Sequence, residues 1–450
     1  MGGIGLAYEA LGELAKALEY GEKALAVARE VGDRRSEGAA LGNLGNVHST
    51  LGNPGRAIEF HEQALISDRE LSDRQGELGD LVNLGSAHSC LGDTARAVTL
   101  YEQAVRIANE MGNLRAEMIA MEGLGNAYLD RGEARKAAEL FEITLIRSRR
   151  LGDRQGQANA LGNLGNAYAA LGRTEKSLDF YKEQMLIVRE LDDRIGEVSV
   201  LGNLGNSFVE LGEIRSAVDY YQKQLHLARE IGHQSAEAAA LGNLGNSYQA
   251  LGEIQNAIEY HHQALEHDRK IGDRKAEAAD LGNLGNAYAD AGKYEHAAEF
   301  YKRALEISRQ IEDRVGVANS LGNLGLMLAN LGKHQQAIEL YQVQMEIAQE
   351  TADRRGEAHA LGNLANAYCE LGEIERALSL YKQRLDIARE MRDPRGEGYA
   401  SWNLSLAFDQ TGKRDEARAF AENALIILEK IEDPNTHMVK HQLSLWQNVS

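Results

Sequence analysis

The chain has 450 residues, of which 43% are hydrophobic, and its 68 acidic and 49 basic side chains give a net charge of −19. This acidic balance excludes a nucleic-acid binder, which needs lysine and arginine to displace phosphate counterions, and it also excludes a protein held on an anionic membrane. The hydrophobic content is sufficient for a packed interior, and no apolar run is long enough to insert into a membrane.

One motif recurs along the chain at a spacing of 40 residues, so we number the places of each repeat from 1 to 40. The string LGNLGN begins at residues 41, 161, 201, 241 and 281, and related strings begin at 1, 81, 121, 321, 361 and 401. Such a period is typical of solenoids, in which each repeat packs on its neighbours. We therefore predict a single array of eleven repeats over residues 1–440, which start at 1, 41, 81, 121, 161, 201, 241, 281, 321, 361 and 401, and a C-terminal cap over residues 441–450.

Each repeat carries two helical patterns, as the copy that begins at residue 161 illustrates. The apolar stripe of its first helix is Leu161, Leu164, Tyr168 and Leu171, and that of its second helix is Leu178, Tyr181, Met185 and Val188. Gly172 separates the two, and a glycine fills this place in all eleven repeats, as expected for a left-handed residue after a helix. Aspartates such as Asp153 precede the next first helix and are predicted to cap it.

Small residues predict where the two helices of a repeat cross. Place 17 in the second helix is alanine in ten of eleven repeats, and place 5 in the first helix is glycine in nine. We expect these two places to face each other, because two small side chains allow helix backbones to approach closely. Neither helix can bury its apolar stripe alone, so the repeats are predicted to stack into an all-α superhelix.

The order of these residues resembles the tetratricopeptide repeat (TPR). In the copy that begins at residue 281 the matching residues are Leu284, Gly285, Tyr288, Gly292, Ala297, Tyr301, Ala304 and Leu305. The 40-residue period is most similar to the repeats of Pins/LGN-type polarity adaptors, and related arrays occur in kinesin light chains and in bacterial NB-ARC-type signalling ATPases. The resemblance implies a right-handed superhelix whose first helices line a concave groove that holds peptide or helical segments of partner proteins.

Asparagine recurs at places 3 and 6 of the first helix, three residues apart and therefore on one helix face. An amide offers a donor and an acceptor, so a regular row of amides can hold a peptide backbone. The candidate peptide-binding asparagines are Asn163, Asn166, Asn203, Asn206, Asn243, Asn246, Asn283, Asn286, Asn323, Asn363 and Asn366. The alternative is that each asparagine bonds to a neighbouring repeat and fixes the stacking.

Glycine recurs at place 2, in the middle of the first helix, where each copy costs about 0.5–1 kcal/mol relative to alanine. If this row faces the groove, glycine lets a ligand approach the helix backbone, and the candidates are Gly162, Gly202, Gly242 and Gly282. The alternative is tight packing between helices. Trp402 replaces glycine in the last repeat, where it can anchor a ligand or pack against the end of the array.

No catalytic motif is found, since the chain has no phosphate-binding loop, no GxSxG elbow and no HExxH. His437 and His441 lack a third ligand, so neither a metal nor a cofactor is expected. We predict a non-enzymatic, cytoplasmic adaptor that binds protein segments, with no nucleic-acid partner. The alternative function is a sensor or autoinhibitory arm of a larger signalling ATPase. The uncapped first repeat also offers a surface for self-association.

Overall fold

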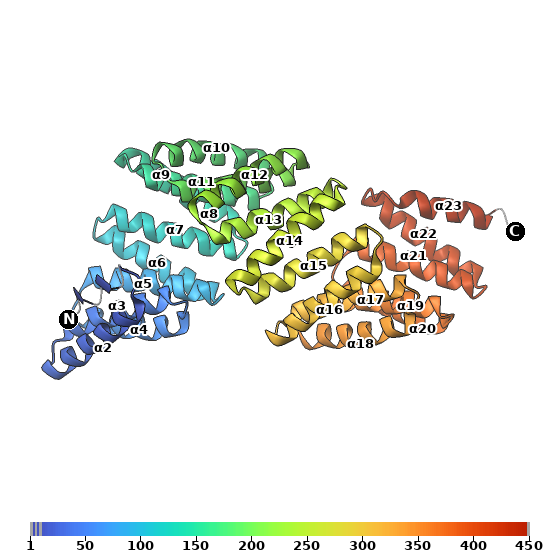
Figure 1. Cartoon of the computed structure of the whole chain (residues 1–450), viewed down its shortest axis with the longest axis horizontal. Coiled ribbons are helices and arrows are strands. Elements are labelled where there is room, and N and C mark those ends of the chain that lie inside the picture. Colours follow the sequence, from blue (N-terminus) through green and yellow to red (C-terminus); the bar gives the residue numbers. More distant parts are fainter. Residues whose placement is uncertain (1–2, 5–6, 9–10, 448–450) are drawn as a thin grey trace. The chain divides into compact units, whose positions relative to one another are not determined.

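A computed structural model describes residues 3–4, 7–8 and 11–447 of the chain. These residues contain helices and no strand, and the chain divides into two compact units, Met1–His233 and Gln234–Ser450. Within each unit, successive helices lie against one another as hairpins (Figure 1). The structure is therefore an all-α solenoid of helical repeats within each unit. The division falls at the one corner between repeats where His233 replaces the usual aspartate or asparagine.

The helices of the two units have nearly uniform lengths. In the first unit they are α2 (Leu14–Val31), α3 (Arg34–Thr50), α4 (Pro54–Glu70), α5 (Arg74–Cys90), α6 (Thr94–Glu110), α7 (Leu114–Asp130), α8 (Ala134–Leu151), α9 (Arg154–Ala170), α10 (Thr174–Glu190), α11 (Arg194–Glu210) and α12 (Ile214–Ile231). In the second unit they are α13 (Gln234–Ala250), α14 (Ile254–Ile271), α15 (Arg274–Asp290), α16 (Tyr294–Gln310), α17 (Arg314–Asn330), α18 (His334–Glu350), α19 (Arg354–Glu370), α20 (Ile374–Glu390), α21 (Pro394–Gln410), α22 (Arg414–Lys430) and α23 (Thr436–Gln447). None of the helices in these described ranges is long and apolar enough to cross a membrane.

The first helix of each hairpin begins before the 40-residue boundary, at place 34 of the preceding copy. The predicted cap explains this start: the carboxylate of Asp153 accepts a hydrogen bond from the backbone N–H of Gly156 at 2.9 Å, and Asp193 does the same for Gly196 at 2.8 Å. A side-chain acceptor satisfies one of the backbone N–H groups left free at a helix start. The predicted aspartate caps are therefore confirmed at these corners.

The two corners of each hairpin both use left-handed backbone. The glycine after every first helix has a positive φ, for example 68° at Gly172, which confirms its predicted role. The corner after the second helix is less uniform, because six of its left-handed residues are not glycine: Ser72, Asp192, Glu312, Ala352, Arg392 and Glu432. These side chains are held in a conformation that costs L-residues about 1–2 kcal/mol.

The predicted apolar stripes form the core, and place-5 glycines such as Gly165 pack against the ring at place 21. Leu161, Leu164 and the second-helix stripe around Tyr181 are buried. A methyl group on Gly165 would lie 2.2 Å from the Tyr181 ring, a contact that the spacing of small residues did not predict. The glycine is required because a large planar ring, and not a small side chain, fills the space between the two helices.

The final helix covers the last hairpin. It begins at Thr436, earlier than residue 441, and it buries Val439, Leu443 and Trp446 against α21 and α22. The indole N–H of Trp446 donates to the carboxylate of Asp409 at 3.0 Å. Trp402 packs against the same cluster, which favours the packing interpretation of that residue over a ligand anchor.

Candidate functional site

We call the surface of the first helices that carries places 2, 3 and 6 the asparagine face. Pockets open beside first helices in both units. The first unit has a pocket of about 320 Å³ lined in part by Gly42, Asn43, Asn46 and Asn83. The second unit has a pocket of about 210 Å³ among α19, α20 and α21. The asparagine face of the first unit therefore has a hollow that can receive a side chain of a ligand. The pocket of the second unit lies beside α19, and none of its lining residues occupies place 2, 3 or 6.

The place-3 asparagines are half-buried and keep their amides free. Within the described ranges, no side-chain hydrogen bond is made by Asn163, Asn203, Asn243, Asn283, Asn323 or Asn363. The alternative role was a hydrogen bond from an asparagine to a neighbouring repeat, and among the described residues it occurs at one pair only. Nδ2 of Asn83 donates to Oδ1 of Asn46 at 3.0 Å. Six of the predicted site residues thus present an unpaired donor and acceptor on one face.

The place-6 asparagines have a structural partner inside their own hairpin. The hydroxyl of Tyr181 donates to Oδ1 of Asn166 at 2.6 Å, and the same bond recurs in three other repeats. Those pairs are Tyr221 with Asn206, Tyr301 with Asn286, and Tyr381 with Asn366. Asn246 has no such partner, because His261 stands in the tyrosine place. In the bonded pairs the amide donors remain available to a ligand, whereas Oδ1 already accepts one hydrogen bond.

The place-2 glycines divide into two groups. A methyl group on Gly162 or Gly202 would lie 2.6 Å from Nε2 of Gln184 or Gln224, so these glycines accommodate a side chain from the second helix. A methyl group on Gly242 or Gly282 would meet nothing within 4 Å. Tight packing therefore explains the first pair, whereas the second pair leaves helix backbone open on the asparagine face.

The covering side chains at place 24 are functional candidates that the sequence analysis missed. Gln184, Gln224 and Gln344 each keep a buried Oε1 with no hydrogen-bond partner, which costs about 1–3 kcal/mol per group. In the repeat that begins at residue 361, Arg384 takes this place and lies over Gly362. The sequence does contain a signal for these candidates. Place 24 is alanine in the repeats of Gly242 and Gly282 but a long polar residue in the repeats of the covered glycines.

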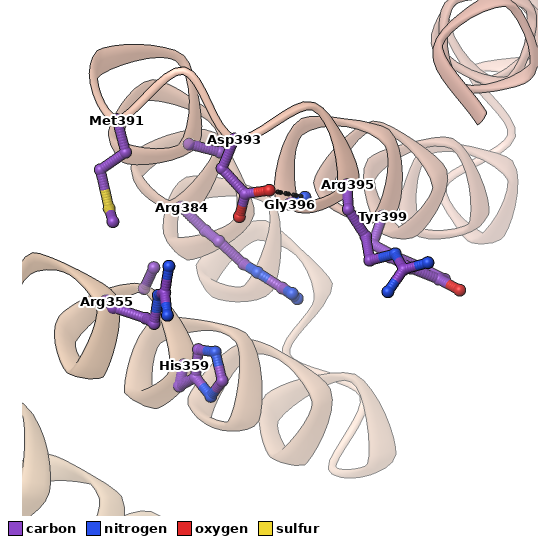
Figure 2. Close-up of a pocket in the computed structure, with 10 residues that line it drawn as sticks. Arg355, His359, Arg384, Met391, Asp393, Arg395, Gly396 and Tyr399 are labelled. Atoms are coloured by element: carbon purple, nitrogen blue, oxygen red, sulfur yellow. Dashed lines mark hydrogen bonds between the residues drawn. The ribbon is translucent and has the colours of Figure 1, made fainter. Parts of the chain in front are cut away.

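Arg384 extends across the pocket of the second unit (Figure 2), and Arg355 and His359 of α19 lie beside it. Burial lowers the pKa of the Arg384 guanidinium, and no described residue forms a hydrogen bond or ion pair with it. The carboxylate of Asp393, which also lines the pocket, accepts the N–H of Gly396 at 3.0 Å and so is already engaged.

The pocket carries an excess of positive charge in a chain of net charge −19. Arg395 on its edge is paired with Asp433 at 3.2 Å, so its charge is compensated. Arg384 and Arg355 have no such partner among the described residues. A guanidinium withdrawn from water without a counter-ion favours binding of an anion, and its planar fork matches a carboxylate.

Comparison with protein families identifies the repeat. Models of the tetratricopeptide repeat match residues 1–70, 77–145, 116–183, 156–230, 236–310 and 316–390. The chain belongs to the tetratricopeptide repeat family. TPR proteins are typically interaction scaffolds rather than enzymes, and the fold is consistent with that role. No curated protein sequence matches this chain.

Several solved structures share the fold at low identity. The apo form of RapI is 13% identical, with a TM-score of 0.60 over 79% of this chain and 99% of that one. The apo quorum sensor NprR from B. thuringiensis is 15% identical, with a TM-score of 0.54 over 80% and 99%. A signal-transduction ATPase with a TPR sensor from Pyrococcus horikoshii is 18% identical, with a TM-score of 0.55 over 78% of this chain but only 55% of that protein. These likenesses concern the fold alone, so the sensor-arm alternative stays a prediction.

Proposed function

We propose that this TPR protein is an adaptor that holds a segment of a partner protein along its asparagine face. The proposal is carried by the place-3 asparagines, whose amides are half-buried yet unpaired. Asparagine is only a moderate helix former, so a row of unpaired amides in the middle of helices gains nothing for folding. The same row can bond to the backbone of a bound segment whatever its side chains are.

The open glycines of the second unit support the same use of this face. Gly242 and Gly282 expose helix backbone next to Asn243 and Asn283. A bound chain can therefore lie closer to these helices than it could over alanine. The mid-helix glycines cost stability, and close approach of a ligand gives a reason for retaining them.

The pocket around Arg384 supplies a specific anchor within the second unit. Its unpaired guanidinium favours an acidic side chain or another carboxylate of the partner segment. Arg355 and His359, both exposed, stand at the same pocket, where Arg355 adds positive charge and His359 adds a ring N–H donor. We therefore propose that segments bound by this unit carry a carboxylate at the position that meets Arg384.

The test begins with selection of 12-residue peptides from a displayed random library on the whole chain. The affinity of a selected, fluorescently labelled peptide is then measured by anisotropy for three proteins: wild type, N283A/N323A/N363A, and the control Q335A/Q336A. The control removes exposed amides from the second helix α18. Loss of three hydrogen bonds at about 0.5–1.5 kcal/mol each should weaken binding by about tenfold or more in the asparagine variant alone.

A second comparison tests the carboxylate anchor. R384M keeps an unbranched side chain, although a shorter one, and removes its charge. It should weaken binding of a peptide that contains glutamate without affecting the glutamine version of that peptide. Circular dichroism verifies that each variant is folded. The proposal is wrong if the asparagine variant binds as tightly as the control, or if no selected peptide is sensitive to either set of substitutions.

A further inference from the structure

The pocket of the first unit contains a cluster of carboxylates with little positive charge to compensate them. Asp68 of α4, Asp73 at the start of α5 and Asp80 within α5 all line it. Asp73 caps the helix through the N–H of Gly76 and has Arg35 at 3.8 Å. Asp68 forms no side-chain hydrogen bond or ion pair in the part of the chain that is described.

Asp80 is buried in this pocket with only part of its bonding capacity used. Its side chain is 7% exposed, and its Oδ1 lies 3.0 Å from Nδ1 of the fully buried His61. Its Oδ2 has no hydrogen-bond partner. An unpaired carboxylate oxygen at a buried position costs free energy unless a donor reaches it, so this atom indicates a missing donor.

Glycines create the room around these carboxylates. A methyl group on Gly76 would lie 2.0 Å from Oδ2 of Asp68, and one on Gly38 would lie 3.1 Å from its Oδ1. Gly42 and Gly79 complete the lining of the pocket beside Asp80. The pocket of about 320 Å³ therefore depends on the absence of side chains at several places around two carboxylates.

The second unit contains the same three residue types with the same spacing, but there the site is closed. His261, Asp268 and Asp280 correspond to His61, Asp68 and Asp80. Asp268 is only 4% exposed, and its Oδ1 lies 3.1 Å from Nδ1 of His267. Ala238 and Ala276 stand where the first unit has Gly38 and Gly76. In the first unit the carboxylates instead face a pocket.

We propose that the pocket formed by Asp68 and Asp80 in the first unit binds the basic side chain, arginine or lysine, of a protein segment lying on the asparagine face. This inference rests on the proposed function and adds a charge requirement to the segment that the first unit accepts. An organic cation fits because it brings several N–H donors to carboxylates that lack them. No group of histidine, cysteine and carboxylate side chains in the described ranges is arranged to hold a metal ion.

Electrostatics agree with a cationic occupant. Burial, and next the neighbouring carboxylates Asp80, Asp73 and Glu77, together raise the pKa of Asp68 to about 6. A bound cation would favour the ionised form and offset this repulsion. Because Asp68 must lose its proton, the affinity for a cation should be about tenfold lower at pH 5 than at pH 7.5.

The probe is N-acetyl-arginine amide, and its neutral isostere N-acetyl-citrulline amide serves as the reference. Saturation-transfer NMR and a titration measure binding to wild type, to D68N/D80N, and to the control E62Q/E70Q. The control removes two exposed carboxylates from α4, the helix that carries Asp68, and changes the net charge by the same amount as D68N/D80N. A second control, D268N/D280N, removes the closed copy of the cluster.

We expect the arginine probe to bind wild type and both controls, and to bind D68N/D80N at least fivefold more weakly. The citrulline probe should bind none of them measurably. Equal binding of arginine to wild type and D68N/D80N overturns the inference, as does equal binding of arginine and citrulline to wild type. If D68N/D80N does not fold, the pH dependence on wild type decides, and a flat profile overturns the inference.

Failure of the pocket is distinguishable from failure of the proposed function. The asparagine variant N283A/N323A/N363A lies entirely in the second unit and tests segment binding without Asp68 or Asp80. If peptide binding still depends on those asparagines but the arginine probe does not bind, the adaptor function stands and only the basic-residue pocket is refuted.

Discussion

Replacing the open glycines at place 2 should stabilise the protein and weaken its binding. Gly242 and Gly282 lie in the middle of α13 and α15, and a methyl group at either would meet nothing within 4 Å. Alanine therefore gains helix propensity without a clash. Each substitution should add about 0.5–1 kcal/mol, or about 1–2 kcal/mol for the double variant if the two sites act independently.

The assay is urea denaturation followed by circular dichroism, together with hydrogen exchange of the peptides that cover α13 and α15. Exchange is needed because repeat arrays do not always unfold as one cooperative unit. G245A is the matched contrast within α13, because its methyl group would lie 2.4 Å from the buried ring of His261. That substitution should cost about 1–3 kcal/mol.

Two results would refute this reasoning. Destabilisation by G242A/G282A would mean that these glycines are needed for packing rather than for access. Unchanged affinity of G242A/G282A for a selected peptide would mean that the ligand does not approach the helix backbone there, even though the stability argument holds.

Three further predictions concern stability. A352G should stabilise its corner by about 1 kcal/mol in urea denaturation, because Ala352 has a φ of 54° and glycine adopts this conformation without steric cost; no gain would show that the corner is not strained. Y221F removes the 2.6 Å hydrogen bond to Asn206 and should cost about 0.5–1.5 kcal/mol, measured in the same way, whereas a neutral result would show that the hydroxyl bonds equally well to water. Burial, and next the Asp268 carboxylate, raise the pKa of Asp280 to about 8, so its contribution to stability is greatest at low pH and is lost as the pH rises through that value. The second unit should therefore lose about 1–3 kcal/mol between pH 5 and pH 8 in wild type relative to D280N, and parallel pH profiles of hydrogen exchange over α15 would contradict this.

Most of the fold could be predicted from the sequence because the same local signals occur many times. The glycine after each first helix, the aspartate before the next one and the apolar spacing between them specify a helical hairpin almost without reference to the rest of the chain. The contact between Gly165 and the Tyr181 ring could not be predicted in this way. It depends on how the two helices are rotated about their axes, and the spacing of small residues leaves that rotation open.

The candidate site was predicted less completely than the fold. The asparagine rows are evident in the sequence, but their division into free place-3 amides and tyrosine-bonded place-6 amides requires the hairpin geometry. The charged pockets were missed because their residues come from different helices and depart from the repeat consensus. Asp68 and Asp80 are 12 residues apart, and Arg384 and His359 are 25 apart, so no local motif connects them. Departures of this kind carry the specificity, whereas the consensus carries the fold.

The ion pairs between neighbouring hairpins have an evolutionary consequence. Arg69 pairs with Glu77 at 2.8 Å, and Arg189 pairs with Glu197 at 2.8 Å, and each pair joins the end of a second helix to the start of the first helix of the next hairpin. Because the donor and the acceptor occupy the same places in many copies, these pairs connect adjacent hairpins within each unit in the same way. An in-frame duplication or deletion of one repeat therefore recreates the junction that it interrupts. The array can change its length by unequal recombination without having to evolve a new interface, and selection can then act on single side chains such as Asp68 or Arg384.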